Sequence, residues 1–364
     1  MAIEMLGLSS YAEDKFCSEI DPSARAVLEH NFTSNMFYAD MTTRDHKKLP
    51  KVTLYGAGFP CTSYSAEGAG AGLGCDSGAV GLHCVMTVAE SRPKSFIFEN
   101  TKHLVSSKHK SDFIFIMDAL ASIVDKTTST PEYFLTYQVL NTKDVGGLPQ
   151  NRERIYIVGI KKSAMRRKLK WPSGCPAMPL SGILEGKVVD PPQLPTTTTE
   201  QRNYLSCVEE MLKKKMNLTD NVVCDIGGGF FNRRGVSHHM TIGHSPCLTR
   251  ARCSTGGYYV FAKQRKMLTV EMTRLQGIPD GRLRIPSGVT ETKFRGMVGN
   301  SFTVTVVARI VDRILRTMNI THRLIGDDDG VEATPWQDLK LEMQGEMPTS
   351  CASSVKRKRV ALCK

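Results

Sequence analysis

Short apolar, β-rich runs alternate with helix-like stretches in the first half of this 364-residue chain, and this alternation constrains the fold most. Runs that are almost entirely apolar are typical of strands buried on both faces of a parallel sheet. The runs are Lys51–Tyr55, Ser95–Glu99, Phe134–Leu140 and Arg154–Ile160, and the helical stretches are Pro22–Asn31, Gly81–Ser91 and Ser111–Asp125. The pattern predicts an α/β fold that binds ligands beyond the carboxyl ends of its strands.

The character of the sequence changes after residue 160 and changes back near residue 254. A basic run, Lys161–Lys170, is followed by Pro- and Thr-rich and then by irregular sequence, which predicts a small domain inserted into a larger one. A strongly amphipathic helix is predicted to begin at Asn300. The predicted parts are residues 1–160 and 254–322 for the larger domain, 161–253 for the insertion and 323–364 for a disordered polar tail.

Composition narrows the class of protein. The net charge of +12 favours a polyanionic partner such as nucleic acid, although some basic proteins bind none. No apolar run approaches the roughly 18 residues of a membrane span, so no membrane partner is expected. The eleven cysteines contain no Cys-x-x-Cys pair, so we expect no metal site, and scattered thiols fit a reducing compartment.

A cysteine follows the first apolar run closely, in Gly58-Phe-Pro-Cys61-Thr-Ser-Tyr-Ser65. The rigid Pro60 before it, at a strand-to-loop turn, can expose the Cys61 sulfur at the ligand edge of the sheet. A free cysteine is more often a small buried hydrophobe. The glycine-rich segment Ala66–Gly74 then supplies the conformations that a closing lid needs, although a surface linker has the same composition.

Charged residues lie at the ends of two further runs. Glu99 ends the second run, where a protonated carboxyl group could donate to a heterocycle nitrogen; a helix cap or a salt-bridged carboxylate is the alternative. Arg152 and Arg154 lie two positions apart at the start of the last run, so their side chains should point the same way and could reach one ligand. A solvated charge pair would have the same pattern.

Together and in this order, these segments resemble the cytosine-C5 methyltransferase family. Three segments match its Pro-Cys, Glu-Asn-Val and Gln-x-Arg-x-Arg motifs, namely Gly58–Ser65, Phe98–Thr101 (with Thr101 where Val is usual) and Pro149–Gly159. Weaker matches are Glu19–Pro22, Ala39–Met41, Leu248–Arg250 with Gly256–Phe261, Arg274–Pro279 and Gly299–Ser301. The resemblance implies a Rossmann-like, S-adenosylmethionine-dependent methyltransferase sheet with a small inserted target-recognition domain.

The resemblance also implies a mechanism on DNA. Cys61 would add its thiolate to C6 of cytosine, so that C5 can take a methyl group from S-adenosylmethionine. Glu99 would protonate or hydrogen-bond N3, and Arg154 together with Arg152 would bind the base oxygen and hold the closed loop. Because a base inside a duplex cannot present this face, the target cytosine would be flipped out.

The methyl donor has its own expected residues. Glu19 is expected to bind the ribose hydroxyls and Asp40 to accept from the adenine amino group. Pro60, Asn300 and Phe302 complete the cofactor pocket that the resemblance implies, and no metal is part of it.

The insertion corresponds to the family's target-recognition segment. Its arginines fit phosphate contacts, with solvated surface charge as the alternative. These arginines are Arg166, Arg167, Arg233 and Arg234.

The chain departs from the family pattern at its beginning. The family starts with a strand and a Phe-x-Gly-x-Gly loop, whereas residues 1–8 resemble the helix after that loop, so we expect the first strand to be missing and S-adenosylmethionine to bind weakly. A weakly active or catalytically silent nucleic-acid-binding homologue therefore stays open. A transfer-RNA cytosine-5 methyltransferase is a second alternative, although its Cys-Phe-Thr signature is absent.

The basic run Lys356–Arg359 bears on cellular location. It fits a nuclear import signal, and a basic run that only keeps a disordered tail soluble is the alternative. We therefore expect the nucleus, or the cytoplasm if the protein is prokaryotic or viral.

Overall fold

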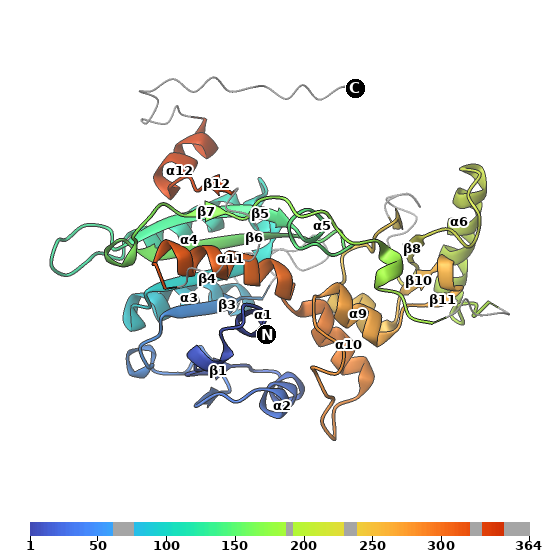
Figure 1. Ribbon diagram of the computed structural model, residues 1–364, viewed down its shortest axis with the longest axis horizontal. Coiled ribbons are helices and arrows are strands. Elements are labelled where there is room, and N and C mark those ends of the chain that lie inside the picture. Colours follow the sequence, from blue (N-terminus) through green and yellow to red (C-terminus); the bar gives the residue numbers. More distant parts are fainter. Residues whose placement is uncertain (61–75, 187–191, 229–238, 321–329, 346–364) are drawn as a thin grey trace.

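The computed structural model describes residues 1–60, 76–186, 192–228, 239–320 and 330–345. Several predicted features lie outside the described residues: Cys61, the glycine-rich segment 66–74, Arg233, Arg234 and Lys356–Arg359. Figure 1 shows a larger sheet with helices on both faces, a smaller sheet to one side, and the helices α9 (Thr269–Leu275) and α10 (Glu291–Asn300) between them.

A four-stranded mixed sheet forms the centre of the larger part (Figure 1). In the strand order β3-β4-β6-β5, its members are β3 (Leu54–Gly58), β4 (Ser95–Thr101), β6 (Glu153–Lys161) and β5 (Tyr133–Asn141). β3 and β4 are parallel, but β6 is antiparallel to both of its neighbours. The expectation of an all-parallel sheet is therefore wrong for β6, because the segment between β5 and β6 is too short for the crossover that a parallel pair needs.

The direction of β6 decides where its arginines lie. Since β6 runs opposite to β4, its first residues lie beside the carboxyl end of β4, and Arg154 is the direct partner of Thr101. On the other side of β4, Gly58 at the end of β3 is the partner of Glu99. Three strand ends that bear predicted site residues therefore meet at one edge of the sheet.

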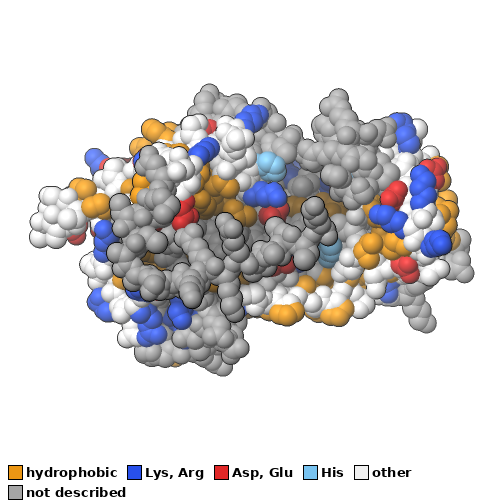
Figure 2. All heavy atoms as spheres, turned by 90° about the horizontal axis from the view of Figure 1, so that it is seen from above, with side chains coloured by type: hydrophobic (Ala, Val, Ile, Leu, Met, Phe, Trp, Pro, Cys, Tyr) orange, Lys and Arg blue, Asp and Glu red, His pale blue; other side chains and the backbone are white. Residues whose placement is uncertain are grey.

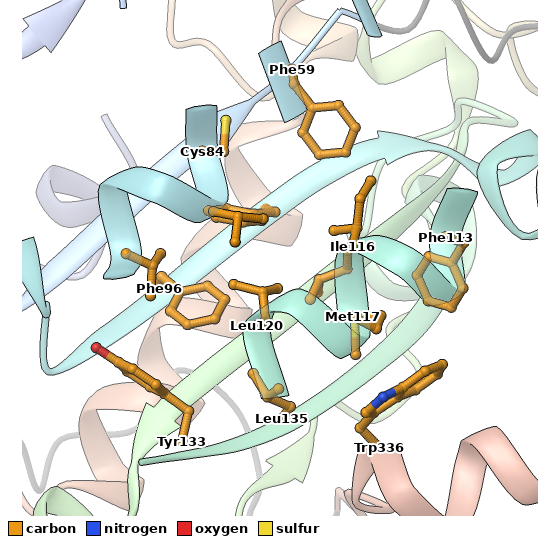
Figure 3. Packing of buried hydrophobic residues seen from close by; sticks show 14 of the residues in the cluster. Phe59, Cys84, Phe96, Phe113, Ile116, Met117, Leu120, Tyr133, Leu135 and Trp336 are labelled. Carbon is orange, nitrogen blue, oxygen red and sulfur yellow. The ribbon is translucent and has the colours of Figure 1, made fainter. Parts of the chain in front are cut away.

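Apolar side chains alternate between the two faces of this sheet, as a strand period of two requires. On one face Phe96 and Phe98 pack against α3 (Asp76–Ser91) and α4 (Lys110–Ala121), as Figure 3 shows. On the other face Ile97 packs in a cluster formed mainly by α11 (Val304–Thr317). The sheet is thus covered on both sides, which its apolar runs predicted.

The helix expected to begin at Asn300 begins later. α11 starts at Val304, whereas Asn300 is the last residue of the preceding helix, α10 (Glu291–Asn300). Ser301 between them is extended, with φ −68° and ψ 158°, so the two helices are separate. The amphipathic pattern located α11 but not its first residue, because Asn300 ends α10 and the chain is extended at Ser301 before α11 begins.

The N-terminal residues form a separate small layer. It contains α1 (Ala2–Met5), β1 (Cys17–Ser18), α2 (Pro22–Asn31) and β2 (Phe37–Tyr38). β1 and β2 pair in parallel as a two-stranded sheet. In the described part of the chain no strand pairs with the outer edge of β3 or with the second edge of β1.

The smaller sheet is antiparallel, with the strand order β11-β10-β8-β9. Its strands are β8 (Val222–Asp225), β9 (Met240–Ile242), β10 (Tyr258–Val260) and β11 (Arg265–Lys266). α6 (Thr198–Lys213) packs on it, and a disulfide joins Cys207 of α6 to Cys224 of β8. The sequence had suggested scattered free thiols, and nothing in their spacing showed that α6 would lie over β8.

Short helices complete the path of the chain. They are η1 (Ser9–Tyr11), η2 (His46–Lys48), η4 (Lys102–Val105), α5 (Thr142–Val145), η5 (Lys162–Ala164), η6 (Leu180–Gly182), α8 (Arg250–Thr255), η8 (Phe261–Lys263) and α9 (Thr269–Leu275).

Two segments belong to the larger core although the sequence predicted otherwise. Leu169 and Trp171, placed in the predicted insertion, are buried in the cluster around α11, where β7 (Lys170–Trp171) pairs with β12 (Val331–Glu332). α12 (Trp336–Gln344) buries Trp336 against α4 and the sheet (Figure 3). The prediction of a disordered tail is therefore wrong for residues 330–345, because Trp336 is buried in the core and Leu339 and Met343 pack against the same cluster.

Candidate active site

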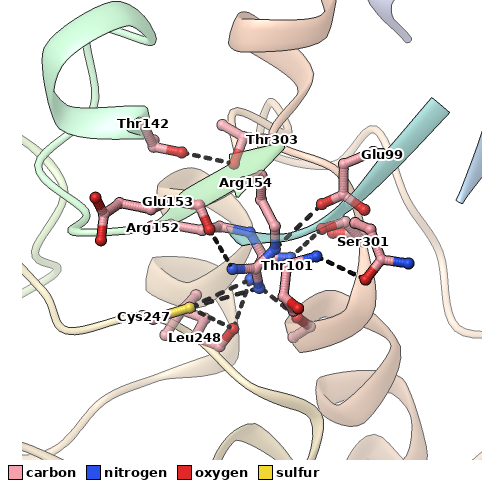
Figure 4. Close-up of polar contacts among 12 residues, drawn as sticks. Glu99, Thr101, Thr142, Arg152, Glu153, Arg154, Cys247, Leu248, Ser301 and Thr303 are labelled. Carbon is pink, nitrogen blue, oxygen red and sulfur yellow. Dashed lines mark hydrogen bonds and ion pairs between the residues drawn. The ribbon is translucent and has the colours of Figure 1, made fainter. Parts of the chain in front are cut away.

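Glu99 lies at the carboxyl end of β4 with its side chain buried. Its Oε1 is 3.1 Å from Nε of Arg154 (Figure 4). Burial raises the pKa of Glu99, and the nearby Arg154 and Arg152 oppose that rise without cancelling it. The site therefore makes the protonated carboxyl group, which can act as a donor, easier to form than it is in water.

Arg154 also contacts a cysteine that no sequence pattern singled out. Its Nη2 is 3.6 Å from Sγ of Cys247, and Nη1 of Arg152 is 3.8 Å from the same sulfur. Burial alone would raise the pKa of Cys247, but the two guanidinium groups outweigh burial and lower it. The paired arginines do point the same way, as their spacing predicted, and together they face Cys247 (Figure 4).

Arg152 is held mainly by backbone carbonyl groups. Its Nη1 donates to the carbonyls of Leu248 at 2.6 Å and Gly299 at 3.2 Å, and its Nη2 donates to Ser301 at 2.7 Å. The side chain is buried, and its Nε has no hydrogen-bond partner. Arg152 thus ties the segment around Leu248 and the junction between α10 and α11 to the start of β6, while Arg154 faces Glu99.

Asn100 positions the segment that leads to Cys61. The buried Asn100 side chain donates through Nδ2 to the carbonyl of Phe59 at 3.2 Å and accepts at Oδ1 from the Thr101 amide at 2.8 Å. Phe59 is buried in the core, and Pro60 is the last described residue before Cys61. The turn that carries the predicted nucleophile therefore starts beside β4.

The two carboxylates expected to hold the methyl donor follow neighbouring parallel strands. Oε1 of Glu19 accepts from the Asp21 amide at 2.9 Å, and Oδ1 of Asp40 accepts from the Thr42 amide at 2.7 Å and the Thr42 hydroxyl at 2.8 Å. The other carboxylate oxygen of each residue, Oε2 of Glu19 and Oδ2 of Asp40, accepts no hydrogen bond from a described residue. Both of these oxygens can therefore accept hydrogen bonds from hydroxyl or amino groups.

Phe302 lies against the end of β3. A Cβ at Gly58 would be 2.5 Å from Cε1 of the Phe302 ring and 3.8 Å from Oε2 of Glu99, so only glycine fits between them. Asn300 is exposed, whereas Pro60 and Phe302 are half-buried. Glycine at position 58 therefore keeps the strand end open between Glu99 and the Phe302 ring.

Arg166 and Arg167 lie away from this edge. They follow β6, and their amides donate to the carbonyl of Thr317 near the end of α11. β6 spans Glu153–Lys161, which at about 3.3 Å per residue separates its two ends by roughly 25 Å. β6 therefore carries Arg166 and Arg167 to the end of the sheet opposite Glu99, and their contacts with DNA phosphates stay a prediction.

The side chains and helices of the described residues bear on metal binding and on membrane spanning. Within residues that the structure describes, no three His, Cys, Asp or Glu side chains are grouped so that they could bind a metal ion. None of the helices in the same residues combines the length and the apolar character needed to cross a membrane.

The sequence patterns identified neither Cys247 nor the role of Gln150, whose side chain holds the backbone at Leu248 and Leu275. Oε1 of Gln150 accepts from the Leu248 amide at 3.1 Å, and its Nε2 donates to the Leu275 carbonyl at 2.7 Å. Gln150 stood inside a quoted motif, so its importance could have been noticed. Cys247 had no such signal, because only folding brings it to β6.

The family model for C-5 cytosine-specific DNA methylases matches residues 3–316. The chain belongs to this family. The Type II methyltransferase M.NgoBI of Neisseria gonorrhoeae is 30% identical to this methylase over 306 residues, which is 83% of this chain and 86% of the relative. M.HaeII of Haemophilus aegyptius is 29% identical over 326 residues, 88% of this chain and 92% of the relative. A crystal structure of S. pombe Dnmt2 methyltransferase has a TM-score of 0.54 at 16% identity, covers 87% of this chain and 94% of its own, and shares the fold.

Family motifs that are far apart along this methylase meet in its structure. Glu99 and Asn100 come from β4, Arg152 and Arg154 from the start of β6, and Phe302 from the junction before α11. The fold is α/β with mixed sheets, consistent with a Rossmann-like methyltransferase.

Proposed function

We propose that this protein transfers a methyl group from S-adenosylmethionine to C5 of a flipped-out cytosine in DNA through a covalent adduct with Cys61. The observation that carries the proposal is Glu99, a buried carboxyl group with a raised pKa that contacts Arg154. A group of this kind suits the transfer or sharing of a proton with a ring nitrogen. It lies at the sheet edge where Pro60 leads to Cys61.

The proposed reaction uses each side chain at one atom. The Cys61 thiolate forms a bond to C6, while Glu99 donates to N3 and removes negative charge from the ring. Arg154 holds Glu99 in place and can donate to the base oxygen. C5 would then accept the methyl group, which leaves S-adenosylhomocysteine behind. Loss of the C5 proton to water breaks the bond between sulfur and C6, and N3 returns its proton to Glu99.

S-Adenosylmethionine supplies an electrophilic methyl group when it is bound. Glu19 would hold its ribose and Asp40 its adenine, through the carboxylate oxygens that accept no hydrogen bond from described residues. Phe302, against Gly58 at the end of β3, would form part of the pocket wall. The family membership and the basic net charge of +12 support DNA as the substrate class.

Trapping with DNA that contains 5-fluorocytosine tests this proposal, because fluorine at C5 cannot leave as a proton and the adduct persists. We expect a denaturation-resistant complex with the wild type in the presence of S-adenosylmethionine, and none with Cys61→Ser. Cys175→Ser, at a half-buried free cysteine, is the matched control and should still form the complex. A complex formed by Cys61→Ser, or by transfer RNA instead of DNA, would contradict the proposal.

One observation favours a second function, that of a weakly active or silent nucleic-acid-binding homologue. β1 and β3 each present an unpaired edge in the described residues, beside the residues expected to hold the methyl donor. Calorimetric titration with S-adenosylmethionine separates the two functions. Micromolar affinity supports methyl transfer, whereas no binding at millimolar donor, with DNA binding retained, supports the silent homologue.

A further inference from the structure

Cys247 is fixed in place by its surroundings. The Tyr258 hydroxyl donates to the carbonyl of Cys247 at 2.8 Å. The next residue, Leu248, donates its amide to Gln150 and accepts from Arg152 at 2.6 Å. The position of the Cys247 sulfur beside the arginine pair is therefore set by contacts on both sides of the residue.

The contacts of the sulfur suit a thiolate better than a thiol. Two guanidinium groups face it, with Nη2 of Arg154 at 3.6 Å and Nη1 of Arg152 at 3.8 Å. The acceptor within reach of a protonated Sγ is the Leu248 carbonyl at 3.6 Å, which already accepts from Arg152 at the shorter distance of 2.6 Å. Donors thus converge on the sulfur, and its acceptor is already used.

The charges of this cluster must be largely balanced because Arg152 and Glu99 are buried, while Arg154 and Cys247 are half-buried beside them. Arg152 and Arg154 carry two positive charges, and an uncompensated buried charge is costly. If Cys247 were neutral, Glu99 would have to be the counter-ion of Arg154. A carboxylate in that role cannot hold the proton that the proposed reaction needs.

We propose that Cys247 is a positioning residue whose thiolate serves as the counter-ion of Arg152 and Arg154, so that Glu99 is free to carry a proton. The catalytic part of this inference rests on the proposed function, whereas the charge on Cys247 does not.

The other titratable groups facing this cluster are neutral near neutral pH. Burial raises the pKa of Tyr156 on β6, of Cys253 on α8 and of Tyr258 on β10. Among the residues that the structure describes, Glu99, Cys247 and the two arginines are therefore the groups whose charges matter most in this cluster.

The direction of the effect follows from Coulomb's law. A neutral side chain at position 247 removes a negative charge from beside Arg154, whose guanidinium then acts on Glu99 alone. An unshared positive neighbour favours the carboxylate and lowers the pKa of Glu99. At a given pH, a smaller fraction of Glu99 then holds a proton.

The first experiment measures the charge on Cys247 without methyl transfer. The ultraviolet absorbance of thiolate is compared across pH between Cys61→Ser and the double variant Cys61→Ser/Cys247→Ser. We expect the difference to persist at least about one pH unit below the ordinary thiol pKa of about 8.5. A difference that appears only at or above the ordinary value overturns the inference.

The second experiment is the pH profile of methyl transfer in the full chain. In Cys247→Ser we expect the alkaline limb, where Glu99 loses its proton, to move down by roughly one pH unit. Cys247→Asp keeps a negative charge and should restore the wild-type limb, which a merely structural role would not do. An unchanged limb in Cys247→Ser, or equal shifts in both variants, contradicts the inference.

The two proposals fail in different ways. If the wild type forms no adduct and transfers no methyl group, the proposed function fails while the absorbance titration still decides the charge on Cys247. If methyl transfer is normal but Cys247 titrates as an ordinary thiol, only the counter-ion inference is wrong.

Discussion

At the candidate site of this methylase, a carboxyl group and a thiol lie beside the same pair of arginines. Glu99 and Cys247 both contact Arg154, yet their pKa values move in opposite directions. Burial dominates at Glu99, whereas the two guanidinium groups dominate at Cys247. The same pair of cations therefore lies beside a carboxyl group whose pKa is raised and a thiol whose pKa is lowered.

At the residue scale we predict that Glu99→Gln lowers the rate of methyl transfer by about 10²–10⁴-fold, the usual contribution of a general acid. Steady-state kinetics on duplex DNA measures this loss. Glu153→Gln is the matched control, since Glu153 pairs with Lys102 at the same sheet edge and is more exposed than Glu99. A rate within twofold of the wild type for Glu99→Gln contradicts the role given to Glu99.

Glu99 should also make stability depend on pH. Because its pKa is raised in the folded protein, folding becomes less favourable as pH rises above the ordinary carboxyl value of 4.5. We expect the free energy of unfolding of the wild type to fall with rising pH in that window relative to Glu99→Gln. Urea unfolding of both proteins across this range measures the difference, and parallel curves would refute it.

At the scale of secondary-structure elements, the end of β3 has room for the Phe302 ring because residue 58 is glycine. A Cβ at Gly58 would overlap the Phe302 ring, whereas one at Gly56 would find its nearest neighbour, Cγ2 of Ile97, at 3.9 Å. We predict that Gly58→Ala displaces Phe302 and lowers methyl transfer roughly ten- to a hundredfold, as small misplacements at active sites do. Gly56→Ala is the control, and kinetics that are equal in the two variants would exclude this role for Gly58.

α12 is the second element whose role can be tested. Trp336 is buried between α4 and the sheet, and its Nε1 donates to Oδ1 of Asp118 at 3.0 Å. We predict that Trp336→Ala lowers the free energy of unfolding by about 3–5 kcal/mol. Trp336→Phe keeps most of the packing but loses the hydrogen bond, so it should cost only about 1–2 kcal/mol. Urea unfolding that does not distinguish Trp336→Ala from the wild type would mean that α12 is not anchored.

At the scale of the whole molecule, positive charge is widely distributed. The net charge is +12, and Figure 2 shows Lys and Arg side chains at both ends of the face in view. The candidate site lies at one end of β6, so the charges that matter for DNA should be those near that end.

We predict that DNA binding weakens steeply with salt, with a log–log slope of about −0.9 for each phosphate contacted. Arg250, in the exposed segment beyond Leu248, is placed to contribute, so Arg250→Gln should make the slope shallower by about one. The double variant Arg166→Gln/Arg167→Gln should leave it unchanged, because both residues lie at the far end of β6. Fluorescence anisotropy at several salt concentrations measures these slopes, and a larger effect of the far-end variant would reverse the proposed orientation.

By itself, the sequence determined the α/β class, the positions of β4, β5, β6 and α2, and Glu99, Arg152 and Arg154 as candidates, because period and motif are local properties of the chain. Only the tertiary structure decided that β6 runs antiparallel, that Arg152 binds carbonyls and that Trp336 anchors α12. It also brought Cys247 to the arginine pair. These features depend on contacts between residues far apart in the sequence, which no local pattern records.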